Sequence, residues 1–156
     1  MDMESEIHRV REISKKMRFS IVTPSYNTGP WIQQTMDSIL LQEGDFEIEY
    51  IVVDSGSTDD TSAILRKYEN MFAKSAYPTA CRNVSFRVIV TKPEGMYTAI
   101  NRGFEEATGD ICAWLNADDL YAPHALETIS RVFTIFPETQ WVKGITDTID
   151  ESGHLT

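Results

Sequence analysis

In Ile111-Cys112-Ala113-Trp114-Leu115-Asn116-Ala117-Asp118-Asp119, five apolar residues run directly into an amide and two carboxylates. A short apolar run of this kind is typical of a buried strand. The acidic cluster would then lie at the carboxyl end of that strand, where open α/β sheets form their ligand crevices. The stretch therefore predicts an α/β fold with a polar site at one edge of the sheet.

Three further apolar runs predict strands, at residues 19–23, 48–53 and 84–90. A helical pattern follows each of the four runs. The side chains expected on the buried faces are Ile32, Met36, Ile39 and Leu40; Ile64, Tyr68, Met71 and Phe72; Met96, Ile100, Gly103 and Ala107; and Leu126, Ile129, Phe133 and Phe136. This alternation of strands and helices predicts a mostly parallel central sheet with helices on both faces.

Prolines and glycines predict where several elements begin and end. Pro30 and Pro123 suit first helical positions, and Gly109 suits a left-handed helix C-terminus. Residues 73–83 have no periodicity and predict a surface connection, whereas residues 141–149 predict one or two further short strands.

The length of 156 residues, 42% of them hydrophobic, suffices for one well-packed core and is too short for two typical domains. Residues 1–17 carry a weak amphipathic pattern without a clear cap, which fits a frayed lead-in helix or a disordered tail equally well. Residues 18–156 are expected to form the domain.

Acidic residues outnumber basic ones by 24 to 14, giving a net charge of -10. This charge argues against a nucleic-acid partner and against an anionic membrane surface. No run approaches the roughly 18 apolar residues of a membrane span, and the acidic N-terminus argues against a signal peptide. Cys81 and Cys112 are expected to be reduced thiols. A cytoplasmic location is therefore expected; association with the inner membrane face would depend on a region outside these residues.

Right-handed crossovers bring the strand-to-helix loops of a parallel sheet to one edge. Residues 23–27, 54–60, 92–95 and 116–119 should therefore converge there as a polar crevice. The plainer alternative is that such loops are polar in every α/β protein. Four loops with this chemistry together favour a ligand site.

Tyr26 and Asp54 are candidates for binding a nucleoside base. A tyrosine ring can stack on a planar base; the alternative is that Tyr26 closes the end of the core. Asp54 can accept hydrogen bonds from an imide or amide N–H. Its alternative is an Asx turn or a helix cap, but other capping candidates are already present at Ser57, Thr58, Asp59 and Asp60.

Asp118 is the candidate metal ligand, because a carboxylate at a strand end is a hard oxygen donor suited to Mn²⁺ or Mg²⁺. A nucleotide diphosphate brings its own oxygens, so the protein need supply only one or two. Asp119 is either a second ligand or a residue that caps the next turn. Asn116 offers a neutral oxygen. Lys92 and Arg102 are the nearest cations by sequence, either for phosphate contact or facing solvent.

Four motifs resemble those of the family 2 glycosyltransferases: residues 20–27 (SIVTPSYN), 51–59 (IVVDSGSTD), 95–103 (GMYTAINRG) and 109–119 (GDICAWLNADD). They occur in order, and the likeness covers about residues 19–150. The resemblance implies a Rossmann-like GT-A fold, a nucleotide-sugar donor that is usually a UDP-sugar, and a glycan or lipid-linked acceptor. It also implies inverting transfer, in which an acceptor hydroxyl attacks the anomeric carbon while a metal stabilises the leaving nucleotide.

The resemblance further implies roles for individual residues. Asp118 stands at the metal-binding position of the family's Asp-x-Asp motif, with Asp119 as a second candidate. The complete set of candidate nucleotide-binding residues is Thr23, Pro24, Ser25, Tyr26, Asn27, Asp54, Ser57, Asn101, Asn116 and Ala117.

The chain departs from the family pattern at three points. Asn116 replaces the first acidic residue of the Asp-x-Asp motif, and the turn at residues 92–95 is less acidic than is usual. The family's general base is expected beyond Thr156, in a segment that follows the donor-binding half, and neither Asp147 nor Asp150 matches it.

Two other classes of function remain open. One is a nucleotide-binding module without transfer activity. The other is a different Mg²⁺-dependent α/β enzyme, such as a nucleotidyltransferase or a phosphoacceptor domain that uses Asp54. It is disfavoured, because neither a dinucleotide-binding glycine turn nor a P-loop lysine follows the first strand.

Overall fold

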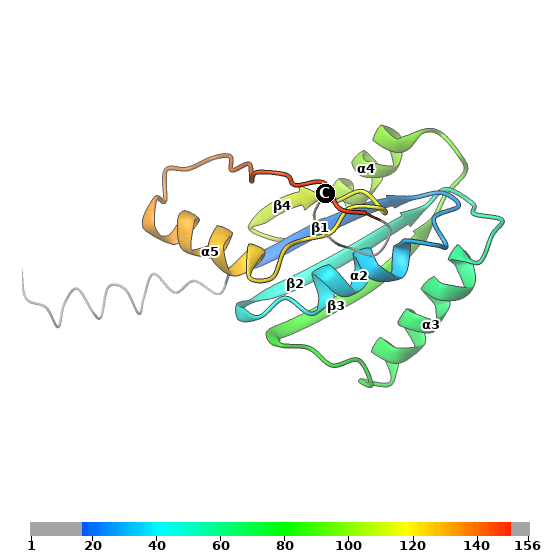
Figure 1. Ribbon diagram of the computed structural model, residues 1–156, viewed down its shortest axis with the longest axis horizontal. Coiled ribbons are helices and arrows are strands. Elements are labelled where there is room, and N and C mark those ends of the chain that lie inside the picture. Colours follow the sequence, from blue (N-terminus) through cyan, green and yellow to red (C-terminus); the bar gives the residue numbers. More distant parts are fainter. Residues whose placement is uncertain (1–16, 151–156) are drawn as a thin grey trace, which may run out of the picture.

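The computed structural model describes residues 17–150. The strands are β1 (Arg18–Ser25), β2 (Gly44–Asp54), β3 (Cys81–Val90) and β4 (Ile111–Trp114). The helices are α2 (Ile32–Leu40), α3 (Thr61–Ala73), α4 (Met96–Glu105) and α5 (Ala125–Ile135) (Figure 1). The predicted lead-in at residues 1–17 lies outside the described residues apart from Met17, which packs against the core.

The described strands form one parallel sheet in the order β3-β2-β1-β4. The long strands β1 and β2 lie at its centre and contribute nearly continuous buried runs. Each strand is followed by a helix that returns the chain across the sheet, as parallel pairing requires. The predicted α/β class is confirmed.

Two apolar clusters lie on opposite faces of the sheet. The larger joins α2, α3 and α5 to one face through side chains such as Met36, Leu65 and Leu126. The smaller joins α4 to the other face, where Ala99 packs near Val22. Helices therefore cover both faces, as the sequence pattern predicted, and α4 lies across the sheet from α2 and α3 (Figure 1).

The strand β4 differs from the buried strand expected at residues 111–115. It pairs only with β1, at the end of the described sheet, and its side chains alternate between half-buried and exposed. Trp114 is 53% exposed, and Cys112 is an exposed free thiol. An apolar run shows that a segment favours a strand, but pairing over long sequence distances decides whether that strand is central or at an edge.

Gly109 is required for a reason other than the one expected. The helix α4 ends at Glu105, and the backbone of Gly109 is not in the left-handed region. A Cβ atom on Gly109 would instead lie 2.7 Å from the carbonyl oxygen of Arg18 and 2.7 Å from the backbone nitrogen of Ser20. The glycine lets the chain pass directly against β1 before it enters β4.

Other predicted boundaries also need correction. Pro30 and Pro123 precede their helices by more than one position, because α2 begins at Ile32 and α5 at Ala125. Residues 141–149 form no strand beyond an isolated bridge at Ile149. They add no strand to the described sheet, and Ile145 is 98% exposed. Phe136 is likewise exposed rather than part of the core.

A buried carboxylate on the α4 side of the sheet links β2 to β1 and to the segment that precedes β4. Glu49, on β2, accepts hydrogen bonds from the hydroxyl groups of Ser20 and Thr108 and from the backbone N–H of Thr108. The guanidinium groups of Arg18 and Arg87 lie 3.5 and 3.6 Å from its Oε1 atom. Burial alone would raise the pKa of Glu49, but the hydrogen bonds from Ser20 and Thr108 and the charge of Arg18 bring it below its ordinary value.

We expect Glu49→Gln to lower the free energy of unfolding by about 2 kcal/mol at pH 7, because charge-assisted hydrogen bonds are lost. A depressed folded-state pKa means that the unfolded state binds more protons near the ordinary value of 4.5. The stabilisation by Glu49 is therefore complete above that pH and is lost as the pH falls through the lowered pKa. Urea unfolding at pH 7 and at acidic pH should show a weaker acid dependence in the variant. The exposed Glu138→Gln is the control, and an equal acid dependence in both variants would contradict this account.

Candidate nucleotide-binding site

The four predicted loops meet in one hollow at the carboxyl end of the sheet, which confirms their expected convergence. The hollow has a volume of about 530 Å³, within the usual range for ligand sites. Its lining comes from the ends of β1 and β2, from the loop before α4 and from the segment after β4. The lining residues are Pro24, Ser25, Tyr26, Asn27, Thr28, Trp31, Ser55, Pro93, Gly95, Met96, Ala99, Asn116, Ala117 and Asp118.

Seven of the candidate site residues line this hollow: Pro24, Ser25, Tyr26, Asn27, Asn116, Ala117 and Asp118. Tyr26 is 53% exposed and belongs to neither apolar cluster. Its ring is therefore free to meet a ligand, and the alternative that it closes the end of the core finds no support. The other five candidates, Thr23, Asp54, Ser57, Asn101 and Asp119, are not among the lining residues.

The side chain of Thr23 is part of the core rather than of the crevice. It is fully buried, and its hydroxyl oxygen accepts a 2.9 Å hydrogen bond from the phenol of Tyr50. Burial raises the pKa of the Tyr50 phenol, so the phenol remains a donor. β1 continues two residues further than expected, through Pro24 and Ser25, and its alternation turns Thr23 toward α2 and α3.

Asp54 joins two of the loops. Its carboxylate accepts hydrogen bonds from the backbone N–H and the hydroxyl of Ser57. The same Ser57 hydroxyl accepts a 2.8 Å hydrogen bond from the backbone N–H of Asn27, whose side-chain oxygen accepts one from the N–H of Thr58. In this arrangement Asp54 and Ser57 hold Asn27 and, next to it, Tyr26 in place. A direct bond from Asp54 to a ligand stays a prediction.

A second set of contacts ties the same two loops one turn further along. The backbone N–H groups of Thr28 and Gly29 donate to Thr61 Oγ1 at 2.9 Å and to Asp59 Oδ2 at 3.0 Å. A hydrogen bond with Thr61 and further bonds from backbone N–H groups lower the pKa of Asp59, so this carboxylate stays ionised as an acceptor. The hollow is therefore built on loops that hold each other in position without a ligand.

The acidic corner of the hollow lies where β4 ends. Asp118 is exposed and lines the hollow, whereas Asp119 accepts a 3.0 Å hydrogen bond from the side-chain amide of Asn116. The other polar atom of the same amide, Asn116 Oδ1, is buried and accepts no hydrogen bond from residues 17–150. Within residues 17–150 no three acidic, histidine or cysteine side chains gather as a complete metal cage. The oxygen donors fit a cation that takes most of its ligands from a bound diphosphate and water.

Comparison with known proteins decides the family. The model of the family described as Glycosyl transferase family 2 matches residues 20–142. The chain belongs to this family. An uncharacterized glycosyltransferase of Nostoc sp. is 30% identical over 134 residues, which are 86% of this chain and 37% of that protein. A PGL/p-HBAD biosynthesis glycosyltransferase of Mycobacterium bovis is 36% identical over 123 residues, which are 77% of this chain and 42% of that protein.

Solved glycosyltransferases have the same fold as this family 2 chain. Staphylococcus aureus TarS 1-349 in complex with UDP matches with a TM-score of 0.61 and 27% identity, over 75% of this chain and 32% of that one. A mannosyltransferase of Pyrobaculum calidifontis, solved with GDP-Man and Mn²⁺, matches with a TM-score of 0.61 and 23% identity, over 83% of this chain and 39% of that one. The chain thus forms an N-terminal portion of a GT-A fold and spans only about two fifths of the relatives' length.

Sequence reasoning missed several residues that line the hollow of this glycosyltransferase chain. Thr28, Trp31 and Met96 border it through the starts of α2 and α4. A signal was present, because residues that immediately follow a strand-end loop begin the next helix at the same edge of the sheet. Gly95, also in the lining, has a φ of 94°, which only glycine adopts easily.

Neither of the two nearby cations lines the hollow. Arg102 forms an ion pair with Glu105 at 3.1 Å. A phosphate contact by Lys92 or Arg102 therefore has no support in this arrangement. No helix within residues 17–150 is both long and apolar enough to cross a bilayer.

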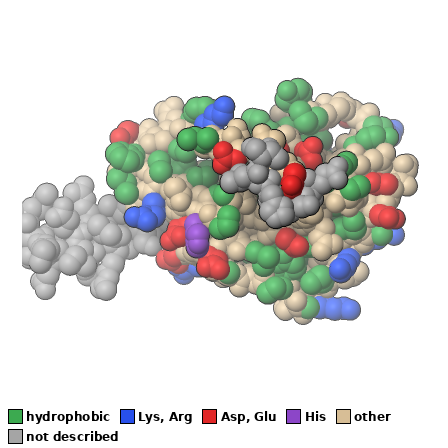
Figure 2. Space-filling view, viewed as in Figure 1, with side chains coloured by type: hydrophobic (Ala, Val, Ile, Leu, Met, Phe, Trp, Pro, Cys, Tyr) green, Lys and Arg blue, Asp and Glu red, His purple; other side chains and the backbone are tan. Residues whose placement is uncertain are grey.

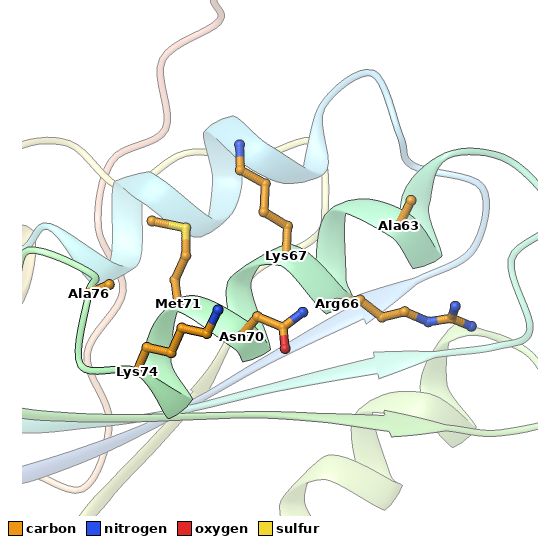
Figure 3. A pocket seen from close by; sticks show the side chains of 7 residues that line it. All are labelled: Ala63, Arg66, Lys67, Asn70, Met71, Lys74 and Ala76. Atoms are coloured by element: carbon orange, nitrogen blue, oxygen red, sulfur yellow. The ribbon is translucent and has the colours of Figure 1, made fainter.

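A second hollow lies along α3 and the residue Ala76 beyond it (Figure 3). Its lining includes Arg66, Lys67 and Lys74, but none of the residues of the four strand-end loops. On the face shown in Figure 2, acidic side chains occur at several separate places, in keeping with the net charge of -10. The α3 hollow thus contains basic side chains but none of the motif residues that line the first hollow. We therefore do not assign the nucleotide to it.

Proposed function

We propose that the chain binds the nucleotide diphosphate of a UDP-sugar together with Mn²⁺ or Mg²⁺, as the donor-binding part of an inverting glycosyltransferase. The observation that carries the proposal is that Tyr26, from the first of the four motifs, and Asp118, from the last, line one hollow. One supplies an aromatic face and the other an exposed carboxylate. A nucleotide diphosphate needs both chemistries in one site.

The base end of the donor would lie at Tyr26. Its exposed ring can stack on uracil, and the loops beside it carry backbone groups able to hydrogen-bond the edge of the base. Pro24, Ser25 and Asn27 line the same hollow, and Asn27 is held by its contacts with Ser57 and Thr58. The UDP complex of TarS, at 27% identity, supports uridine as the nucleoside to test first.

The metal end of the donor would lie at Asp118. A net charge of -10 would repel a free diphosphate, so a divalent cation between the carboxylate and the phosphates supports binding in this field. Asn116 Oδ1 can accept a hydrogen bond from a metal-bound water or serve as a neutral ligand. When bound, the cation would offset the negative charge that develops on the departing nucleotide. Asp119 keeps the amide of Asn116 oriented.

The acceptor in this proposal is a hydroxyl group of a glycan or of a lipid-linked sugar, and its proton passes to a general base beyond Thr156. Transfer by the whole protein can be separated from nucleotide binding alone with a longer chain that includes this region. Release of UDP from a UDP-sugar by the longer chain supports the transferase. Tight donor binding without any turnover in the presence of candidate acceptors would favour the alternative of a binding module.

Calorimetric titration of residues 1–156 with UDP tests the donor site directly. We expect binding in the presence of Mn²⁺ that weakens about tenfold or more when the metal is chelated, a loss of about 1.4 kcal/mol or more. GDP and ATP under the same conditions report on the choice of base. Absence of metal-dependent binding for both UDP and GDP would overturn the proposal.

A further inference from the structure

Trp31 is a large side chain for which the packing of the protein gives no reason. It lines the hollow, is 49% exposed and belongs to neither apolar cluster. Its indole N–H has no acceptor within residues 17–150. Both the flat face and the donor group of the indole are therefore available to a ligand.

Helix stability does not explain Trp31 either. It occupies the N-cap position of α2, and no side-chain hydrogen bond caps this helix. Serine, threonine, aspartate and asparagine are favoured there because their oxygens accept hydrogen bonds from the first-turn N–H groups, which an indole cannot do. A tryptophan at this position gives up about 1 kcal/mol of capping relative to those residues.

The position of Trp31 within the hollow follows from the residue one turn later. The backbone N–H of Thr35 donates to the carbonyl oxygen of Trp31 at 3.2 Å, so the two residues lie on the same side of α2. The hydroxyl of Thr35 donates to the carbonyl oxygen of Ala117 at 2.8 Å. This contact fixes α2 against the segment that carries Asp118. Trp31 stands one turn nearer the helix N-terminus, where its backbone N–H donates to the carbonyl oxygen of Thr28, and it lines the same hollow as Asp118.

From this geometry we infer that Trp31 is a stacking platform for a pyranose ring in the hollow. The inference rests on the proposed donor site. The sugar of a nucleotide sugar is bonded directly to the second phosphate, so a cation on Asp118 would place the ring inside the hollow that Trp31 also lines. The C–H face of a pyranose is apolar and complements the electron-rich face of an indole. The free indole N–H can donate to a ring hydroxyl.

The ring on Trp31 comes either from the donor or from the acceptor, and both present the same C–H face. Binding of UDP alone should not depend on Trp31, because the nucleoside and the metal contact Tyr26 and Asp118. A platform for the donor adds to the affinity of a UDP-sugar but not to that of UDP. A platform for the acceptor adds to the binding of a free glycoside once UDP and metal are in place.

The first arm of the test compares UDP with UDP-glucose, UDP-galactose and UDP-N-acetylglucosamine, each with Mn²⁺, on the unmodified chain and on Trp31→Ala. We expect UDP to bind both proteins within about twofold. If the platform serves the donor, the UDP-sugar that binds best should lose about three- to tenfold in affinity in Trp31→Ala, and most of that loss should be restored in Trp31→Phe, which keeps a flat ring. Trp141→Ala, exposed and outside the hollow, is the matched control.

The second arm uses fluorescence. In a chain with Trp114→Phe and Trp141→Phe, Trp31 is the only tryptophan. Addition of methyl glucoside, methyl galactoside or methyl N-acetylglucosaminide to the complex with UDP and Mn²⁺ should change its emission if the platform serves the acceptor. Either a donor-sugar effect or this emission change supports the inference.

Normal UDP binding with neither effect would overturn the platform and leave the donor site intact. Failure of UDP and GDP to bind the unmodified chain would overturn the donor site and the platform together. Thermal unfolding of Trp31→Ala and Trp31→Phe separates a lost contact from a lost fold, because the Phe variant keeps most of the side-chain volume.

Discussion

Replacement of Asp118 by alanine is expected to weaken metal-dependent UDP binding by about a hundredfold or more. The loss of an outer residue that orients a metal ligand already costs about 10- to 100-fold in metal affinity. Removal of the exposed carboxylate that faces the hollow should cost at least as much, since no other acidic side chain is among the lining residues. Binding measured with chelator should not weaken and should if anything become stronger, because without a cation the carboxylate only repels the diphosphate.

Asp119→Ala distinguishes the two adjacent carboxylates. Asp119 acts through the amide of Asn116, so its loss should weaken metal-dependent binding by about tenfold rather than abolish it. Asp147→Ala removes an exposed carboxylate outside the hollow and serves as the control for net charge. Equal effects of the Asp118 and Asp119 variants would contradict the division of roles. Equal effects of all three variants would mean that Asp118 acts only through the net charge of the chain and not as a metal ligand.

Gly109→Ala is expected to lower the free energy of unfolding by about 3 kcal/mol, at the upper end of typical overpacking costs. The added Cβ would lie 2.7 Å from two backbone atoms of β1, and a central strand cannot move aside as a flexible side chain can. The 2.7 Å hydrogen bond from the Gly109 N–H to the hydroxyl of Ser20 would be strained as well. In a chain of this size the midpoint of thermal unfolding should fall by about 6–12 °C.

Gly144→Ala is the matched control, because no atom lies within 4 Å of its added Cβ and its φ is not positive. We expect a change within about 0.5 kcal/mol, as for an ordinary surface substitution. If Gly109→Ala is as stable as Gly144→Ala, the close approach of the chain to β1 is not a constraint on this fold.

Hydrophobic patterning was sufficient to predict the helices and the parallel sheet, because each amphipathic stripe needs one neighbour to bury it. The patterning did not reveal the strand order. The run that ends in Leu115 looked as apolar as β2, yet β4 lies at the end of the described sheet. Gly109 shows a related limit: a left-handed backbone and a close approach both select glycine, and only the tertiary contact separates them.

The candidate site was predictable to the level of loops but not of side-chain direction. The ends of parallel strands meet at one edge, which brought Tyr26 and Asp118 into one hollow as expected. Thr23 turns into the core because β1 continues past it, and Asp54 binds Ser57 of its own loop. Trp31 was missed because its place in the hollow depends on how α2 packs against the segment after β4, through the contact between Thr35 and Ala117.

Paramagnetic broadening of the amide NMR signals of the isotope-labelled chain tests the central claim most directly, since the broadening by Mn²⁺ falls steeply with the distance between the ion and the nucleus. With UDP present, substoichiometric Mn²⁺ should broaden residues 116–119 and the first turn of α2 most strongly. UDP alone should shift the signals of residues 24–27 and 54–58. The same Mn²⁺ without UDP should produce much weaker broadening. Broadening centred away from Asp118, or unaffected by UDP, would contradict a metal held jointly by this carboxylate and a bound diphosphate.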